Sequence, residues 1–347
     1  MSAVALRVAA GPGVGLGHAI RCRTLAAHLP HAIFVTSGAG AQTLCGLGVH
    51  PGRIETIVEG EPVAAWLRRV PSVDRVVFDT LSAGQAAATE SEVAAVARTG
   101  RSVTVIDSMP PDEFTGDENT ARQPSLVVTP YFGARDLRRP PRARRWLAGP
   151  AWAVLPTELR RARHQPFPRE PRILVTCGAV DPGGLSARAA AILGHGSAPV
   201  DVIVGPEFSD ETTSALRALG QAHPVLRLHE NVADMLPHYL RSTIVVGRPG
   251  LVRYEIAALG RTGIYLWESE DYLSYFRNFT EGGIAEIYFS TAPGGSDRFD
   301  RRLLELTDPG TLQEVASRNA AAMAAIEGVG AEGVAAEILR TEGWSKQ

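Results

Sequence analysis

The sequence has few cysteines, almost no net charge and no long hydrophobic run, and each of these features excludes a class of protein. Cys22, Cys45 and Cys177 are odd in number and lack the spacing of a metal site, so we expect buried free thiols. A formal net charge of -2 at pH 7 gives no electrostatic signature of nucleic-acid binding. No run of about eighteen apolar residues occurs, and the amino terminus lacks a signal-peptide pattern. We therefore expect a cytoplasmic protein without an integral membrane segment.

Length and composition predict two globular domains. The chain has 347 residues, of which 45% are hydrophobic and 21% charged, and each of two domains of this size can bury its own core. A stretch punctuated by Pro166 and Pro168 separates the two halves. We predict a first domain over 1–155, a linker over 156–171, a second domain over 172–325, and a packing helix with a tail over 326–347.

Short apolar runs alternate with helix-compatible segments in both halves, and most of the runs are rich in Val or Ile, which is typical of buried parallel strands. The expected strands lie at 4–10, 32–36, 74–79, 102–107, 125–129, 172–177, 200–204, 225–228, 243–247 and 263–267. The expected helical segments lie at 18–29, 40–46, 61–69, 85–98, 185–193, 210–218, 232–236 and within 308–339. This alternation predicts an α/β protein with two doubly wound, Rossmann-like domains that bind ligands at the carboxyl ends of their strands. Asp79 and Asp107 each end a strand, where an Asp serves either a local turn or cap or a ligand contact.

A glycine-rich turn joins the first expected strand to the first expected helix. Its glycines, which permit positive φ and let a ligand approach the N–H groups of the helix start, are Gly11, Gly13, Gly15 and Gly17. His18 follows the turn, and the positive potential of a helix amino terminus favours the neutral imidazole that a general base requires. The glycine spacing is not that of a P-loop, and no acidic residue closes the next strand as a dinucleotide fingerprint requires.

A second turn of interest follows the expected strand at 243–247. Unpaired N–H groups near Gly250 and Leu251, at an expected helix start, form a potential anion site. Glu255 lies about one turn further along, either facing a ligand or exposed on the helix surface. Arg248 and Arg253 flank the turn, and each either pairs with phosphate oxygens or lies on the surface.

These turns carry a resemblance to a known family. The segment Gly-Leu-Gly-His-x-x-Arg-Cys-x-x-Leu-Ala-x-x-Leu, at 15–29, resembles the start of the UDP-sugar hydrolases of pseudaminic acid biosynthesis and their spore-coat relatives. These proteins form the PseG/SpsG-like group of the GT-B glycosyltransferase superfamily. The segment at 246–260 resembles the group's Ser-Ala-Gly-x-x-x-x-Glu-Leu-Ala-Ala-Leu-Gly motif, and Gly178 and Asp181 match its Gly-Gly-x-Asp turn, although Ala179 replaces a glycine. The resemblance implies a GT-B fold, in which the two domains face each other across a cleft.

The resemblance also implies roles for the matched residues. It makes His18 the catalytic base, and it places Gly15, Gly17 and Arg21 near the sugar or the acceptor. Glu255 is implied to hold the ribose. The residues implied to bind the nucleotide diphosphate are Gly178, Gly250, Leu251 and Val252. No Asp-x-Asp metal signature is present, so we expect neither a metal nor a cofactor, the nucleotide sugar being a substrate.

The sequence departs from the group's pattern where the donor sugar is read. Many relatives carry Asp-Asn-Gln-x-x-Asn, whose amides contact the sugar, whereas this chain has Glu-Asp-Tyr-Leu-Ser-Tyr at 270–275. Tyr272 and Tyr275 suit a wall on which a sugar or a heteroaromatic acceptor stacks, with ordinary helix packing as the alternative. For Phe276 and Phe279, at i and i+3, the spacing favours helix packing. We therefore expect a donor sugar other than the group's usual N-acetylated one.

Together these features predict an inverting, metal-independent enzyme of the glycosyltransferase type. Its partners are a nucleotide-sugar donor and a small-molecule acceptor, and His18 deprotonates the acceptor, which then displaces the nucleotide diphosphate. Two alternatives stay open. In one, water is the nucleophile and the enzyme is a nucleotide-sugar hydrolase; in the other, the protein binds a nucleotide sugar without catalysis. The sequence specifies neither the base of the nucleotide, UDP or GDP, nor an oligomeric state.

Overall fold

A computed structural model describes residues 3–58, 60–80, 86–106, 124–136, 139, 143–268, 273–317, 326 and 330–340. The chain divides into two compact units, Met1–Pro156 together with Gly328–Gln347, and Thr157–Glu327. Most of the stretch predicted as a linker therefore belongs to the second unit, where it contains helix α5 (Thr157–Ala162). No helix in the described part of the chain has both the length and the apolar character needed to cross a membrane.

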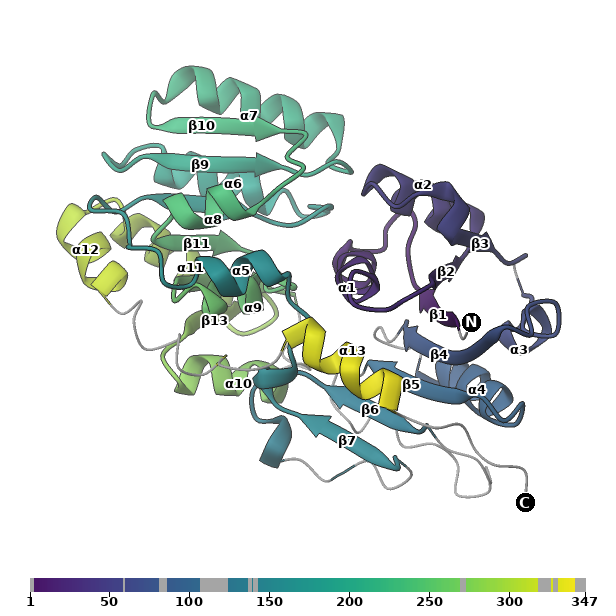
Figure 1. Cartoon of the computed structure of the whole chain (residues 1–347). Coiled ribbons are helices and arrows are strands. Elements are labelled where there is room, and N and C mark those ends of the chain that lie inside the picture. The colour runs from purple at the N-terminus through teal and green to yellow at the C-terminus, as the bar shows by residue number, and fades with distance from the viewer. Residues whose placement is uncertain are drawn as a thin grey trace. The chain divides into compact units, whose positions relative to one another are not determined.

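The first unit is built on a seven-stranded parallel sheet with the order β3-β2-β1-β4-β5-β6-β7 (Figure 1). Its strands are β1 (Ala3–Val8), β2 (Ala32–Thr36), β3 (Ile54–Thr56), β4 (Val73–Asp79), β5 (Ser102–Ile106), β6 (Leu126–Thr129) and β7 (Arg145–Ala148). Its helices are α1 (Gly17–Ala26), α2 (Gly38–Gly46), α3 (Val63–Trp66), α4 (Ala86–Ala97) and α13 (Gly330–Arg340). Short 3₁₀ turns occur at Pro51–Arg53, Ala134–Asp136 and Pro150–Trp152.

Both faces of this sheet are covered, which explains why its strands read as continuous apolar runs. Val4, Leu6 and Val8 of β1 pack into a core that also contains buried residues of α1, α2 and α13. Ala3 and Ala5, on the opposite face of the same strand, pack into a second core with residues of α3 and α4. The C-terminal helix α13 thus belongs to the core of the first unit.

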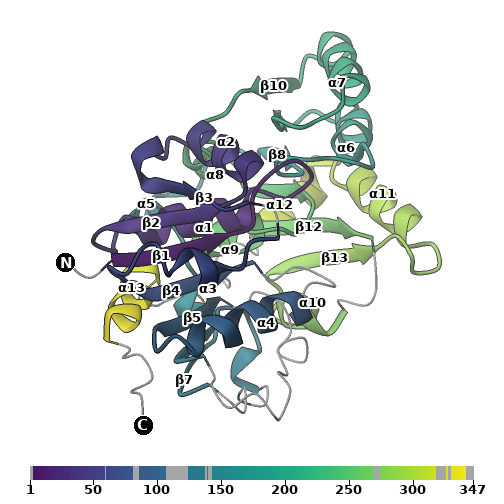
Figure 2. The ribbon, with the colours of Figure 1, turned by 90° about the vertical axis from the view of Figure 1, so that its right-hand side faces the viewer.

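The second unit is built on a six-stranded parallel sheet with the order β10-β9-β8-β11-β12-β13. Figure 2 shows its last two strands, β12 and β13, side by side. Its strands are β8 (Ile173–Thr176), β9 (Val200–Val204), β10 (Leu226–Glu230), β11 (Ile244–Gly247), β12 (Thr262–Trp267) and β13 (Ala285–Phe289). Its helices, besides α5, are α6 (Leu185–Leu193), α7 (Asp210–Ala222), α8 (Leu236–Arg241), α9 (Val252–Ala258), α10 (Leu273–Glu281), α11 (Gly295–Glu305) and α12 (Pro309–Ser317). The helical turn predicted at 232–236 is wrong, because the helix begins where that turn was expected to end. Pro237 occupies its first turn, a position that a proline tolerates.

Each sheet has a point at which the direction of winding reverses. The chain runs outward from β1 to β3 and then returns to begin β4 on the other side of β1. In the second unit it runs outward from β8 to β10 and then returns to β11, on the other side of β8. In open parallel sheets, ligands bind at the carboxyl ends of the strands at this switch point. The ends of β1 and β4, and those of β8 and β11, are therefore the places to look for sites.

At the second switch point, β8 and β11 approach so closely that a side chain is excluded. Gly247, the last residue of β11, pairs with Thr176 of β8 and has a φ of 153°. A Cβ atom at this position would lie 1.8 Å from the carbonyl oxygen of Thr176. Glycine is therefore required here, and it brings the loops that follow the two strands together.

Candidate functional site

The glycine-rich turn of the first unit brings His18 to the carboxyl end of β1. Within this turn, positive φ values occur at Gly11 and Gly13 and not at Gly15 or Gly17. Two of the four glycines therefore use the conformational freedom that glycine permits. Helix α1 begins at Gly17 without a side-chain cap at Leu16, so His18 lies in its first turn.

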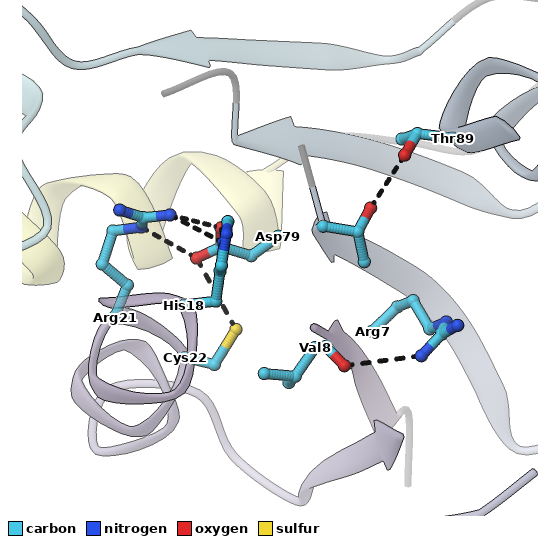
Figure 3. Close-up of polar contacts among 8 residues, drawn as sticks. Arg7, Val8, His18, Arg21, Cys22, Asp79 and Thr89 are labelled. Carbon is cyan, nitrogen blue, oxygen red and sulfur yellow. Dashed lines mark hydrogen bonds and ion pairs between the residues drawn. The ribbon is translucent and has the colours of Figure 1, made fainter. Parts of the chain in front are cut away.

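His18 contacts a carboxylate on the other side of the switch point. Asp79, the last residue of β4, is fully buried, and its Oδ1 lies 2.6 Å from Nδ1 of His18. Arg21 donates from Nε to Oδ2 at 2.9 Å and from Nη2 to Oδ1 at 2.6 Å. The thiol of Cys22 lies 3.9 Å from Oδ2. Figure 3 shows these side chains of α1 converging on Asp79.

The charge of Asp79 determines which nitrogen of His18 carries the proton. Burial alone raises the pKa of Asp79, but the charges of Arg21 and His18 and their hydrogen bonds outweigh burial and lower it to about 2. The ionised carboxylate can only accept hydrogen bonds, so Nδ1 of His18 must donate. Nη2 of Arg21 lies 2.9 Å from the same nitrogen, but a protonated Nδ1 cannot accept from it.

The other ring nitrogen is available for chemistry. In the neutral ring with a proton on Nδ1, the lone pair lies on Nε2. Nε2 has no hydrogen bond to any residue that the structure describes, and 14% of the His18 side chain is exposed. The arrangement of a buried carboxylate, an oriented imidazole and an available Nε2 suits proton abstraction from a small nucleophile.

Arg21 and Asp79 make contacts that the sequence did not predict. Arg21, which we predicted to contact a sugar or acceptor, is buried, and its guanidinium binds Asp79 with two nitrogens. Its position makes it a partner of the carboxylate, and its charge is the largest of the effects that lower the pKa of Asp79. For Asp79 we expected a local turn or cap or a ligand contact, and its contact with His18 was missed. Asp107, the other strand-end aspartate, lies outside the described residues.

The loops after β8 and β11 contain the residues assigned to a diphosphate. Gly178 is exposed and has a φ of 82°. Asp181 caps helix α6, because its two carboxylate oxygens accept from the N–H groups of Leu185 and Ser186 at 2.9 and 2.8 Å. In the second loop, Gly250 donates its N–H to the carbonyl of Arg248, so the unpaired group expected there is absent.

Three residues around α9 agree better with a binding site. The N–H groups of Leu251 and Val252 donate to no other residue among those described. Glu255 is buried, which excludes the alternative that it is an exposed surface residue. Burial raises the pKa of Glu255, and a hydrogen bond from the Tyr239 hydroxyl to its Oε2, at 2.6 Å, acts in the opposite direction. Its Oε1 has no hydrogen-bond partner in the described chain, so it can accept from a ligand hydroxyl.

The aromatic segment is described only in part. Phe276 and Phe279 are buried, which confirms the prediction that they pack in the core. Tyr272 lies outside the described residues, and Tyr275 belongs to α10, although its side chain is not among those described. The proposed aromatic wall therefore stays a prediction.

The structure is similar to those of several solved proteins. It matches MurG from Acinetobacter baumannii with a TM-score of 0.64 and 14% sequence identity, over 98% of this chain and 100% of that chain. It matches the spinosyn forosaminyltransferase SpnP with a TM-score of 0.63 and 13% identity, over 97% of this chain and 98% of that chain. It also matches Anabaena Alr3699/HepE, solved in complex with UDP and glucose, with a TM-score of 0.56 and 13% identity, over 98% of this chain and 99% of that chain.

Comparison of the sequence alone adds nothing to this, since no protein-family model and no curated protein matches the chain. The structural matches extend over almost the whole chain and confirm the predicted α/β class and the GT-B fold. The narrower resemblance to the PseG/SpsG-like group stays a prediction.

Proposed function

We propose that the chain is an inverting, metal-independent enzyme of the glycosyltransferase type, which displaces the nucleotide diphosphate of an activated sugar with a small acceptor nucleophile. The observation that carries the proposal is the contact of 2.6 Å between His18 Nδ1 and Asp79 Oδ1. Asp79 fixes the ring with Nε2 as its basic atom. Its negative charge also stabilises the imidazolium that forms when Nε2 takes a proton.

The second unit supplies the binding of the donor. Oε1 of Glu255 and the N–H groups of Leu251 and Val252 are available to a ligand, and they suit ribose hydroxyls and a diphosphate. The UDP and glucose bound to Anabaena HepE, which shares the fold, support a nucleotide sugar as the class of donor. Gly178 lies in the neighbouring loop, at the same end of the sheet.

The reaction follows from these roles. Nε2 of His18 removes the proton of the acceptor as the acceptor atom forms a bond to the anomeric carbon. The bond between that carbon and the phosphate oxygen breaks, and the nucleotide diphosphate leaves with the electron pair. Direct displacement inverts the configuration of the sugar. A general base contributes about 10²- to 10⁴-fold to such a rate, and positioning contributes more.

The first test is to identify the nucleophile. The protein is incubated with UDP-, GDP- and dTDP-sugars, with and without a panel of alcohols, amines and thiols, and release of the nucleotide diphosphate is measured. We expect release to require an acceptor. Release in water alone would support the hydrolase to which the PseG/SpsG-like resemblance points. Saturable binding without release under any condition would contradict an enzymatic role.

The second test addresses the assigned base. His18→Ala should lower kcat by about 10²- to 10⁴-fold and leave the Kd of the nucleotide within about twofold, because the imidazole acts on the acceptor. Asp79→Asn should also lower kcat, because the amide does not hold the ring in the required tautomer. His164→Ala, which removes an exposed histidine of the second unit, is the control and should leave kcat unchanged. Unchanged turnover in His18→Ala would refute the proposed base.

A further inference from the structure

Arg248 is the first residue after β11, at the switch point of the second sheet. Its neighbour Gly247 pairs with Thr176 of β8 on one side and with Tyr265 of β12 on the other. Burial raises the pKa of the thiol of Cys177, the residue after β8, and the charge of Arg248 acts in the opposite direction. Arg248 therefore stands where an open parallel sheet binds its ligand.

The guanidinium of Arg248 is held in place by contacts that a ligand can exchange. It lies over the ring of Trp267, with its Cζ 5.2 Å from the ring centroid. Nη2 of Arg248 is 2.6 Å from Oε1 of Glu268, which follows β12. The Arg248 side chain is 19% exposed, whereas the Glu268 side chain is 58% exposed. A carboxylate this well solvated contributes little to the pair and can return to water at low cost.

Arg253, the other arginine of this turn, is in a different situation. It is buried, and it donates to the carbonyl oxygens of Pro249 and Gly250. Its Cζ also lies 4.8 Å from the ring centroid of Tyr254 and 5.1 Å from that of Phe276. Arg253 therefore fixes the shape of the loop, and of the two arginines only Arg248 is placed to bind a ligand.

We propose that Arg248 binds the diphosphate of the donor nucleotide and that Glu268 holds its guanidinium until the ligand arrives. The proposal rests on the proposed function, which assigns nucleotide binding to the second unit. The planar guanidinium presents N–H groups that match phosphate oxygens, and it supplies positive charge to the departing diphosphate. Trp267 keeps the guanidinium at the carboxyl end of the strands while phosphate replaces Glu268.

The experiment measures binding of a series that differs only in phosphate. The Kd values of uridine, UMP and UDP, and of the guanosine series, are determined by calorimetry. Arg248→Ala should weaken binding of the diphosphate by about 10- to 100-fold and leave that of the nucleoside unchanged. Arg248→Lys should give an intermediate affinity, and it serves as the reporting variant if the alanine variant does not fold. Glu268→Gln should tighten diphosphate binding about two- to fivefold, because a competing anion is removed.

A matched control distinguishes this role from a general effect of charge. Arg217→Ala removes an arginine that pairs with Glu230 at 2.8 Å on the exposed surface of the same unit, and it should leave every Kd unchanged. If the native protein binds no nucleoside diphosphate, both the proposed function and this inference fail. If it binds UDP or GDP and Arg248→Ala binds equally well, only the inference fails. Equal loss for nucleoside and diphosphate, or weaker diphosphate binding in Glu268→Gln, would also overturn the inference.

Discussion

Asp79 remains charged inside the first unit because donors surround it. A buried carboxylate costs several kcal/mol unless it is paired and hydrogen-bonded. Arg21 supplies two N–H donors and His18 a third. Since the contacts that stabilise the charge are the ones that orient the imidazole, the stability of the first unit and the geometry of the proposed base are linked through one residue.

This link predicts a dependence of stability on pH. The pKa of Asp79 is about 2 in the folded protein, below the ordinary value of 3.8. Its stabilising contribution is therefore complete above about pH 4 and is lost as the pH falls towards 2. Asp79→Asn lacks this contribution. The difference in unfolding free energy between the native protein and the variant should shrink by about 2 kcal/mol between pH 5 and pH 2 in denaturant titrations.

Asp74→Asn provides the control for this measurement. Its carboxylate is 48% exposed and pairs with Arg75 at 2.6 Å, so removing it should change the unfolding free energy by less than about 1 kcal/mol over the same range. A difference between the native protein and Asp79→Asn that stays constant with pH would show that Asp79 is not held as the charged partner of Arg21 and His18.

Of the two residues His18 and Asp79, the sequence predicts only His18 as part of the site. His18 can be found because it directly follows the glycine turn. Asp79 is distant in the chain, and its contact with His18 exists because β4 lies beside β1. Only the order of strands in the sheet provides that information, and a doubly wound order with β4 beside β1 is the signal that would have found it. The contact of Arg21 with Asp79 was missed for the same reason, since it also depends on the place of β4 in the sheet.

At the scale of elements, burial separates most of the strands that the sequence predicts from those that it misses, although the edge strand β10 is predicted. The central strands are covered on both faces and appear as continuous apolar runs. The missed strands β3, β7 and β13 all lie at the edge of a sheet, where polar residues such as Glu55, Arg145 and Glu286 are tolerated. The misplaced start of α8 affected the predicted site more than the missed strands did. It left Tyr239 outside any expected helix, so the contact of Tyr239 with Glu255 was not foreseen.

If Glu255 binds the nucleotide as proposed, its contact with Tyr239 of α8 makes that binding sensitive to pH. The Tyr239 hydroxyl lowers the pKa of Glu255 against the larger effect of burial, which raises it. Tyr239→Phe removes that hydrogen bond, so the pKa of Glu255 rises further and the ionised form, the stronger acceptor, becomes scarcer at a given pH. In Tyr239→Phe the loss of nucleotide affinity on acidification should therefore begin at a higher pH. Calorimetric Kd values between pH 5 and pH 8 measure this.

Two variants complete the test. Tyr288→Phe removes a similar hydrogen bond, from Tyr288 to Glu286 at 3.0 Å, and should leave the pH profile of binding unchanged. Glu255→Gln should weaken binding and abolish the part of the profile that arises from this carboxylate. If Tyr239→Phe and the native protein have the same profile, Glu255 does not bind the nucleotide as an ionised acceptor.

At the scale of the whole molecule, the path of the chain is less predictable than its fold class. Alternating strands and helices were sufficient to predict two doubly wound domains. The C-terminal segment was predicted as a packing helix, and the apolar spacing of Val334, Ala335 and Ile338 indicates one buried face. That spacing is compatible with either sheet, because both need helices to cover them. Only the structure shows that α13 returns to the first unit, where it packs near α1.

Because α13 packs in the first unit, we expect the stability of that unit to depend on the end of the chain. Ile338 of α13 is 1% exposed in the first unit's core, and Leu312 of α12 is 2% exposed in the core of the second. Replacing either residue by alanine leaves a cavity that costs about 2–5 kcal/mol. The rate of hydrogen exchange of the strand amides shows which unit each substitution destabilises. Ile338→Ala should speed exchange in β1 and β6 with little change in β8, and Leu312→Ala should do the reverse. Faster exchange of β8 in Ile338→Ala would contradict the assignment of α13 to the first unit.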